Sequence, residues 1–247
     1  MPSPAGDTLW VALQGRGEVQ PIDRATRALG APTAVATSGG HGPRALAPDG
    51  SRLLATRFLS PHDFAEVWDL EASSGALAAT VQQPKFGGDE HRDTTAAGRG
   101  VANQLVAITL SPDGQSAWVV GTKPNVERGL LTGGIDLDAD NTVRNVIARI
   151  DLASGTLVDA VDLDNSDSAS GLAFSPLGDY LFVSLQGNDE VSVLDARERE
   201  SSTGLGSFVT RLGAASAPQG LCIDPPTERT FVQNFLGRSV TVFDTAC

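Results

Sequence analysis

Basic side chains gather in two stretches of an otherwise acidic chain. Lysine and arginine total 18 against 30 aspartates and glutamates, which gives a net charge of −12. Even so, Arg92 and Arg99 lie in one stretch, and Lys123 and Arg128 lie in the other. Guanidinium and ammonium groups donate hydrogen bonds to anionic groups. We therefore interpret the two stretches either as solvated surface loops or as a docking surface for a partner or an anionic group.

Candidates for hydrolytic chemistry are few. The three histidines, His41, His62 and His91, lie far apart, and none has the spacing of a metal-ligand pair. His41 comes directly before Gly42-Pro43-Arg44 at the entrance to an expected inner strand, where it could face a central channel. Asp224 is the other candidate for a reaction at such a channel. No Gly-x-Ser-x-Gly elbow occurs, so the catalytic residues of any enzyme activity stay unknown.

Metal and cofactor sites are not predicted either. Asp136, Asp138 and Asp140 alternate as at the start of a calcium loop, in which the first carboxylates converge on the ion. The match then fails, because Asn141 stands where the loop needs glycine and Ile147 where it needs glutamate. We therefore expect acidic turns and no metal. No Cys-x-x-Cys-His segment for haem attachment is present, and we expect no cofactor.

The elements that would position these side chains repeat along the chain. Tight turns recur at wide spacing, each between an apolar run and a strand-like run. Proline presets φ at the first central position of such a turn, and Asp-Gly accepts the positive φ needed later. The copies are Ala47–Gly50, Ser111–Gly114, Ser175–Gly178 and Asp224–Thr227, the last of which keeps the proline but has no glycine.

An apolar strand that ends in aspartate forms the second half of the repeat. Its apolar and polar residues alternate, which is typical of a strand with one buried face. One unit therefore reads as four antiparallel strands, which is the blade of a β-propeller. The strands end at Asp23, Asp69, Asp151, Asp195 and Asp244.

We expect an all-β fold and a single β-propeller domain over residues 1–247, with about five four-stranded units. The first unit lacks its opening strand and the last lacks its closing strand, and the two pieces do not complement each other into one blade. Either five blades close imperfectly, or the chain is a fragment of a longer ring, such as a seven-bladed one. The units are roughly 8–36, 43–82, 104–163, 169–212 and 217–247, with insertions at 83–103 and 122–142.

These phrases resemble the YVTN (YncE-like) β-propeller repeat family over nearly the whole chain. Repeats of this kind are good evidence for fold and poor evidence for function. Four segments, 98–103, 123–129, 141–144 and 234–244, also look like bacterial extracytoplasmic proteins that carry such a propeller beside a cytochrome c peroxidase-like haem domain. The residues that match their insertion motifs are Arg99, Asn103, Lys123, Asn125 and Arg128.

The resemblance implies a non-catalytic binding or scaffold module that presents its insertion loops to a protein partner, such as a c-type cytochrome or a peroxidase-like haem domain. It also implies a periplasmic or extracellular location, although the start of the chain shows no signal peptide and a cytoplasmic location stays open. The alternative is an enzyme working at the central channel, such as a lactonase-type hydrolase. The acidic charge argues against nucleic acid, and no apolar stretch is long enough to predict membrane insertion.

Overall fold

Strands account for almost all of the regular structure in the computed structural model. The structure describes residues 2–3, 5–35, 41–60, 64–83, 98–125, 142–163, 167–197 and 208–245. Two single 3₁₀ turns, η1 (Gln14–Arg16) and η2 (Pro225–Thr227), also occur in this part of the chain. Most of the strands and tight turns that the repeats predict lie within these ranges.

Strands pair only with strands that neighbour them in the sequence, and every pairing is antiparallel. The described residues form five sheets. The first contains β1 (Thr8–Leu13), β2 (Glu18–Asp23) and β3 (Thr33–Ala34); the second β4 (His41–Asp49), β5 (Arg52–Leu59), β6 (Ala65–Glu71) and β7 (Leu77–Gln83); the third β8 (Asn103–Leu110), β9 (Ser116–Pro124), β10 (Val143–Asp151) and β11 (Thr156–Leu163); the fourth β12 (Ala169–Phe174), β13 (Tyr180–Leu185), β14 (Glu190–Asp195) and β15 (Phe208–Gly213); the fifth β16 (Pro218–Asp224), β17 (Arg229–Asn234) and β18 (Ser239–Asp244).

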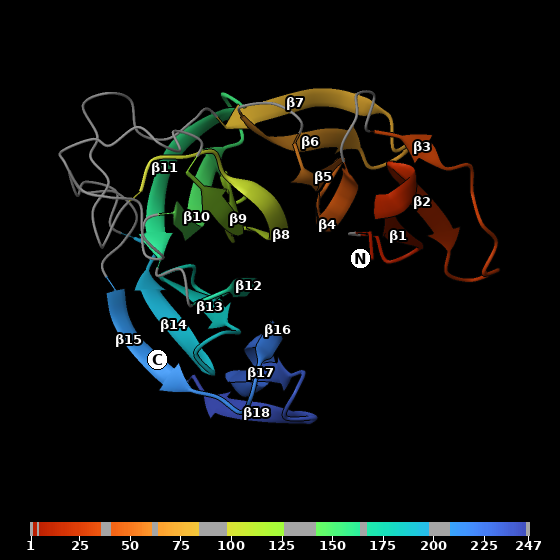
Figure 1. Ribbon diagram of the computed structural model, residues 1–247. Helices are drawn as coiled ribbons and strands as arrows, with labels where there is room; N and C mark the ends of the chain where they lie inside the picture. The colour runs from red at the N-terminus through yellow and green to blue at the C-terminus, as the bar shows by residue number, and fades with distance from the viewer. Residues whose placement is uncertain are drawn as a thin grey trace.

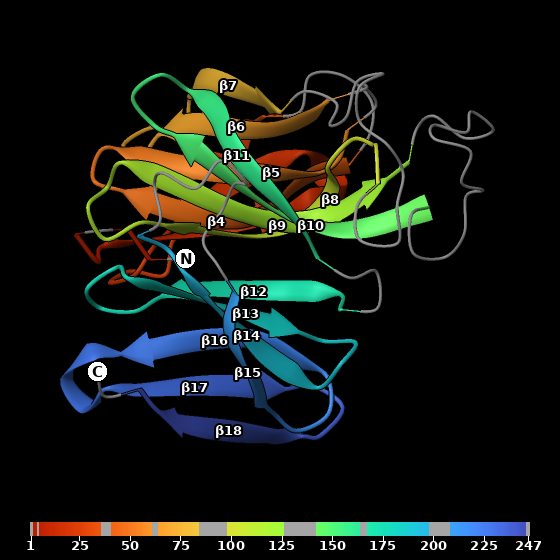
Figure 2. The same ribbon diagram turned by 90° about the vertical axis from the view of Figure 1, so that its left-hand side faces the viewer.

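The five sheets stand side by side along an open arc, with β4, β8, β12 and β16 on its inner side (Figure 1). Seen from the side, neighbouring sheets face each other like the blades of a propeller (Figure 2). The expected all-β propeller fold is confirmed. Among the described residues the first sheet has no inner strand and the last has no outer strand, as the repeats predict. The number of blades in a complete ring stays a prediction.

Apolar clusters fill the space between neighbouring sheets. Successive residues of a strand point to opposite faces, so Leu53 packs toward the first sheet and Leu54 toward the third. In the fourth sheet Leu181 packs toward the third sheet and Phe182 toward the fifth. Burial of a side chain of this size contributes about 2 kcal/mol. Each middle sheet is thus held on both faces, and this rigid stack positions the loops at either end.

The repeated turns have the conformation that their residues predict. Gly114 and Gly178 have φ of +67° and +75°, and each donates its N–H to the serine that opens the turn, Ser111 or Ser175, at 2.9 Å. In the fourth copy Glu228 takes the left-handed position with φ of +51°. These turns join each inner strand to its neighbour, and all of them lie on the same face of the arc.

The repeated strand of the second sheet ends two residues later than the sequence pattern predicts. Arg52 lies opposite Glu71 in the β5–β6 pairing, at the place where Ser116 lies opposite Asp151 in the third sheet. Glu71 and not Asp69 therefore ends the repeated strand and opens the next turn, where the Glu71 carbonyl accepts the Gly75 N–H at 2.7 Å. Asp69 instead accepts hydrogen bonds from Arg52 Nε and Nη2 at 3.0 and 2.6 Å.

Candidate functional site

The inner strands all begin on the same face of the arc. Their first residues line one pocket of about 310 Å³, here called the axial pocket. Four sheets contribute to it, through Arg44 of β4, Gln104 of β8, Ser170 of β12 and Gln219 of β16. Other members of the lining are Phe58, Val106, Thr122, Asn145, Ser168 and Gln186. No single segment of the sequence contains this site, because it exists only once the sheets stand side by side.

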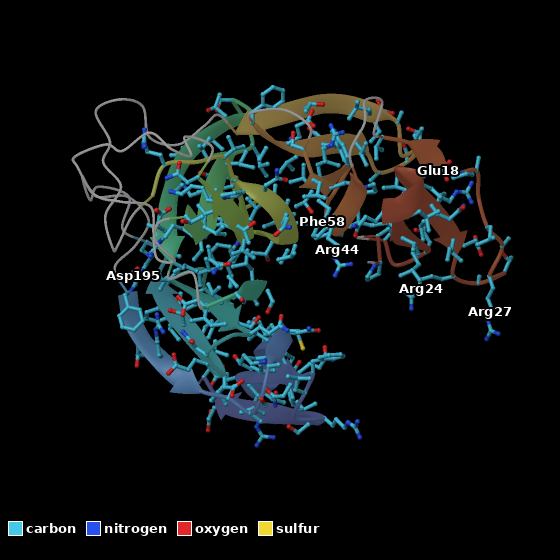
Figure 3. All side chains as sticks on the ribbon, viewed as in Figure 1. Glu18, Arg24, Arg27, Arg44, Phe58 and Asp195 are labelled. Atoms are coloured by element: carbon cyan, nitrogen blue, oxygen red, sulfur yellow. The ribbon has the colours of Figure 1, made fainter. Side chains whose placement is uncertain are left out.

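Arg44 is the charged side chain of the axial pocket. Its guanidinium lies 5.8 Å from the centre of the Phe58 ring, and its Nη1 lies 3.5 Å from Gln14 Oε1. Figure 3 shows the Arg44 and Phe58 side chains together at the inner edge of the arc. The contact with the ring orients the guanidinium without neutralising it. Since the described lining contains no carboxylate, the pocket presents a positive charge among amide and hydroxyl groups.

A β-bulge near the start of every inner strand shapes the axial pocket. The pairing shifts at Pro43/Leu46, Asn103/Ala107, Ala169/Gly171 and Pro218/Gly220. A bulge re-aims side chains at the end of a strand.

Hydroxyl groups of one sheet then donate hydrogen bonds to the inner strand of the next sheet. Thr56 Oγ1 donates to the Leu105 carbonyl at 3.1 Å, and Ser184 Oγ donates to the Gln219 carbonyl at the same distance. Ser170 Oγ adds a bond to the Pro218 carbonyl at 2.9 Å. The backbone around the axial pocket is therefore held in place before any ligand arrives.

The two residues considered for hydrolysis lie on opposite faces of the arc. His41 is the first residue of β4, so its backbone lies at the axial-pocket end; its side chain is outside the described part. Asp224 is the last residue of the 7-residue strand β16, which places it about 20 Å from the start of that strand. The structure does not bring them together. No group of three His, Cys, Asp or Glu side chains among the described residues could hold a metal ion.

Three of the basic and amide residues predicted to form a docking surface are buried. Arg99, Lys123 and Asn125 are only 4%, 5% and 1% exposed. Lys123 Nζ forms an ion pair with Asp162 on β11, and Asp162 Oδ2 also accepts the Gly98 N–H at 3.0 Å. The expectation that these side chains are exposed on the surface is corrected: a buried charge needs a partner, and Lys123 finds one on another strand.

Asn103 also serves the fold, and Arg128 lies outside the described residues. The Asn103 Oδ1 atom accepts the backbone N–H groups of Ser60 and Gln104, each at 3.0 Å. It therefore fastens the start of β8 to the second sheet, beside the axial pocket. A binding role for these residues stays a prediction.

The described ends of the two insertions lie side by side. Val101 donates its N–H to the Pro124 carbonyl at 3.3 Å, and Asn125 donates its N–H to the Thr142 carbonyl at 2.8 Å. Thr122, next to this contact, lines the axial pocket. Both insertions therefore leave the stack at the end that carries the axial pocket, and this end is called the insertion rim below.

Comparisons with solved structures identify the fold. Kuenenia stuttgartiensis hydrazine synthase is similar, with a TM-score of 0.77 and 20% identity over 99% of this chain and 70% of that one. A functionally unknown protein from Desulfotomaculum acetoxidans has a TM-score of 0.57 and 16% identity, over 99% of this chain and 64% of that one. The Swd1 β-propeller domain of Myceliophteria thermophila has a TM-score of 0.56 and 14% identity, over 94% of this chain and 60% of that one.

At these identities the comparisons establish a β-propeller and nothing about its ligand. The chain spans less than two thirds of the length of the second and third of these structures. No family model matches the sequence, and no curated protein matches it either. In the part of the chain that the structure describes, no helix has the length and apolar character needed to cross a membrane.

Proposed function

We propose that this propeller is a non-catalytic binding module whose insertion rim receives a protein partner. The observation that carries the proposal is that the axial pocket and the described ends of both insertions lie at the same end of the stack. Propellers are rigid, and a preformed surface avoids much of the ordering cost of association. A partner seated on this rim would contact the insertions and place one of its own groups in the axial pocket.

The chemistry of the axial pocket favours an acidic group on the partner. Arg44 offers a guanidinium, and Gln104 and Gln219 offer amide donors. Guanidinium groups bind carboxylates through charge-assisted hydrogen bonds, which are about twice as strong as neutral ones. We therefore assign Arg44 the role of anchoring a partner's aspartate, glutamate or terminal carboxylate.

Membership of the YVTN (YncE-like) family and a periplasmic or extracellular location belong to the same proposal. Both rest on the sequence resemblance, and the solved structures support only the propeller fold. A haem-containing partner receives no support from those structures. We therefore propose only a protein partner with an acidic contact group, and a haem protein is tested as one possible partner.

Peptide binding tests the role of Arg44. A fluorescein-labelled peptide of alternating glycine and glutamate is titrated with the full chain, and its anisotropy is compared with that of the glutamine version. We expect saturable binding of the acidic peptide only, weakened about tenfold or more in Arg44→Ala because a charge-assisted contact is lost. Arg229→Ala removes an exposed arginine at the opposite end and is the control. Equal binding of both peptides, or an unchanged Arg44→Ala variant, would refute the proposal.

Three further experiments test the finer alternatives. Arg128→Ala should leave the unfolding free energy unchanged and weaken binding of the acidic peptide, if the second insertion contacts the partner. Titration with a soluble c-type cytochrome shows whether a haem protein occupies the same rim, through its competition with the peptide. Metal analysis with a lactonase assay tests the hydrolase alternative, and stoichiometric metal with turnover would overturn the non-catalytic assignment.

A further inference from the structure

A second pocket, of about 340 Å³, lies between the third and fourth sheets at the end opposite the axial pocket. Two of the repeated turns form its mouth, through Pro112 and Leu177. These turns touch, because a Cβ atom added at Gly178 would lie 3.1 Å from the Pro112 ring. We call this cavity the turn pocket. Its size falls within the range that holds a small molecule.

Aromatic rings form one wall of the turn pocket. Trp118 and Phe174 meet edge to face, with their ring centres 5.5 Å apart and an interplanar angle of 87°. The indole Nε1 of Trp118 donates to Ser116 Oγ at 3.0 Å, which fixes the ring. Leu177 stands at the mouth with 82% of its surface exposed, at the turn position that Asp113 occupies in the preceding copy. Trp118 is only 2% exposed, so the apolar surface open to a ligand is that of the partly buried Phe174 and of Leu177 at the mouth.

Arg149 supplies a guanidinium beside this wall. It lies opposite Trp118 in the β9–β10 pairing, with its Cζ atom 6.0 Å from the ring centre. Its Nε atom is buried and has no hydrogen-bond partner among the described residues. A buried donor without an acceptor is uncommon in a folded protein, so the Arg149 Nε–H is open to an acceptor.

The described carboxylates near the turn pocket make no ion pair with Arg149, although its charge adds to the Ser154 hydrogen bonds in lowering the pKa of Asp151. Asp113 accepts bonds from Ser111 Oγ at 2.5 Å and from the Gln115 N–H at 3.0 Å, so its carboxylate is engaged within its own turn. Asp151 shares a smaller adjoining pocket of about 160 Å³ with Arg149. No ion pair between Arg149 and a carboxylate occurs within 4.0 Å in the described part of the chain.

Arg197 adds a second cation at the mouth. Its Nη1 lies 3.8 Å from Asp179 Oδ2, its Nε lies 3.8 Å from Asp195 Oδ1, and 63% of its side chain is exposed. These separations are long for a charge-assisted hydrogen bond. The Arg197 side chain can therefore turn toward an anion at the mouth while keeping its backbone bond to Asp195.

We propose that the turn pocket binds a small aromatic carboxylate, with its ring against Phe174 and Leu177 and its carboxylate at Arg149, next to Trp118. An aromatic ring matches the apolar wall, and a carboxylate satisfies the buried Arg149 donor. This site is independent of the insertion rim, because it lies at the other end of the stack and uses none of the same residues. Either site can fail without the other.

Phenylacetate is the probe, and selective ¹⁵N labelling of tryptophan is the readout. The chain has 3 tryptophans, so the spectrum shows one indole signal for each, and Trp118→Phe assigns the signal of interest. We expect a saturable shift of the Trp118 signal, while the signals of Trp10 and Trp68 stay in place. Phenylacetamide, which keeps the ring and loses the charge, should produce no comparable shift.

Variants then separate the charge from the fold. Arg149→Met keeps a long side chain and should weaken phenylacetate binding about tenfold or more, whereas Arg229→Ala should bind normally. If Arg149→Met disturbs the Trp10 or Trp68 signals, Leu177→Glu provides a surface change that should repel the carboxylate from the mouth. Three results would overturn the proposal: no saturable shift, equal binding of phenylacetamide, or unchanged affinity in both Arg149→Met and Leu177→Glu.

Discussion

Lys123 shows how a single residue can be misjudged from its setting in the sequence. It stands among polar residues in a long connection, which is typical of a solvated loop, yet its side chain is buried against Asp162. The two residues lie on different strands, and no local pattern links them. Such pairing becomes visible only when β9 and β11 are placed in one sheet.

Removing the Asp162 charge should destabilise the fold. Asp162→Asn leaves Lys123 charged and buried without its carboxylate, which typically costs on the order of 3 kcal/mol. Urea unfolding measures the loss. The double variant Lys123→Met with Asp162→Leu replaces both charges by apolar groups and should be more stable than Asp162→Asn alone. A single variant within about 0.5 kcal/mol of the parent would show that the pair does not support the fold.

Asp151 makes part of the stability dependent on pH. Hydrogen bonds from the Ser154 N–H and hydroxyl, both at 2.7 Å, hold the pKa of Asp151 below its ordinary value of 3.8. A lowered pKa in the folded state adds stability above the unfolded pKa, and this is lost as the pH falls through the folded value. Asp151→Asn should therefore be less stable than the parent at neutral pH, and the difference should vanish in acid.

The same turn provides the control for that measurement. Ser154→Ala removes one of the hydrogen bonds and should raise the pKa of Asp151 toward 3.8, which an NMR titration of its carboxyl carbon detects. Thr26 holds Asp23 in the same way in the first sheet, so Asp151→Asn should leave the Asp23 titration unchanged. A pKa of Asp151 that does not move in Ser154→Ala would assign the shift to another cause.

At the scale of elements, the turns between strands are the most predictable feature. Ser111-Pro112-Asp113-Gly114 predicts its own conformation because each residue satisfies a local requirement of the turn. The β6 strand is harder, because Asp69 and Glu71 are two residues apart and point to the same side. The repeat phrase fits either acid, and only the pairing with Arg52 decides between them.

The candidate sites were less predictable than the elements. The axial pocket uses Arg44, Gln104, Ser170 and Gln219, which are separated by whole sheets and form no motif. The turn pocket likewise joins Trp118 and Arg149 of one sheet to Phe174 of the next. Repeat patterns report the contacts within a sheet, whereas a pocket between sheets depends on which side chains the stacking brings together.

Asp113 tests how much one turn contributes. Asp113→Ala removes the acceptor for Ser111 Oγ and the Gln115 N–H and should cost on the order of 1 kcal/mol. The corresponding residue of the next turn is Leu177, so Leu177→Ala is the matched control and should be nearly neutral. Acidic-peptide binding at the insertion rim should be unaffected in both variants. Unchanged urea unfolding in Asp113→Ala with lost peptide binding would contradict this assignment.

At the scale of the molecule, the sheets differ in how many neighbours they have. In the third sheet Ile147 packs toward the fourth sheet and Ala148 toward the second, and both are fully buried. In the fifth sheet Val240 and Val242 are 59% and 48% exposed on β18. The central sheet is thus covered on both faces, while the last is held mainly by the cluster it shares with the fourth.

This asymmetry predicts where the protein opens first. Strands β10 and β18 occupy the same position in their sheets, but β10 pairs with β9 and β11 whereas β18 pairs only with β17 among the described strands. Hydrogen exchange follows local opening, which is cheapest where few contacts must break. We expect the paired amides of β18 to exchange at least about tenfold faster than those of β10. Equal protection would mean that the stack opens only as a single cooperative unit, with its end sheet as stable as its centre.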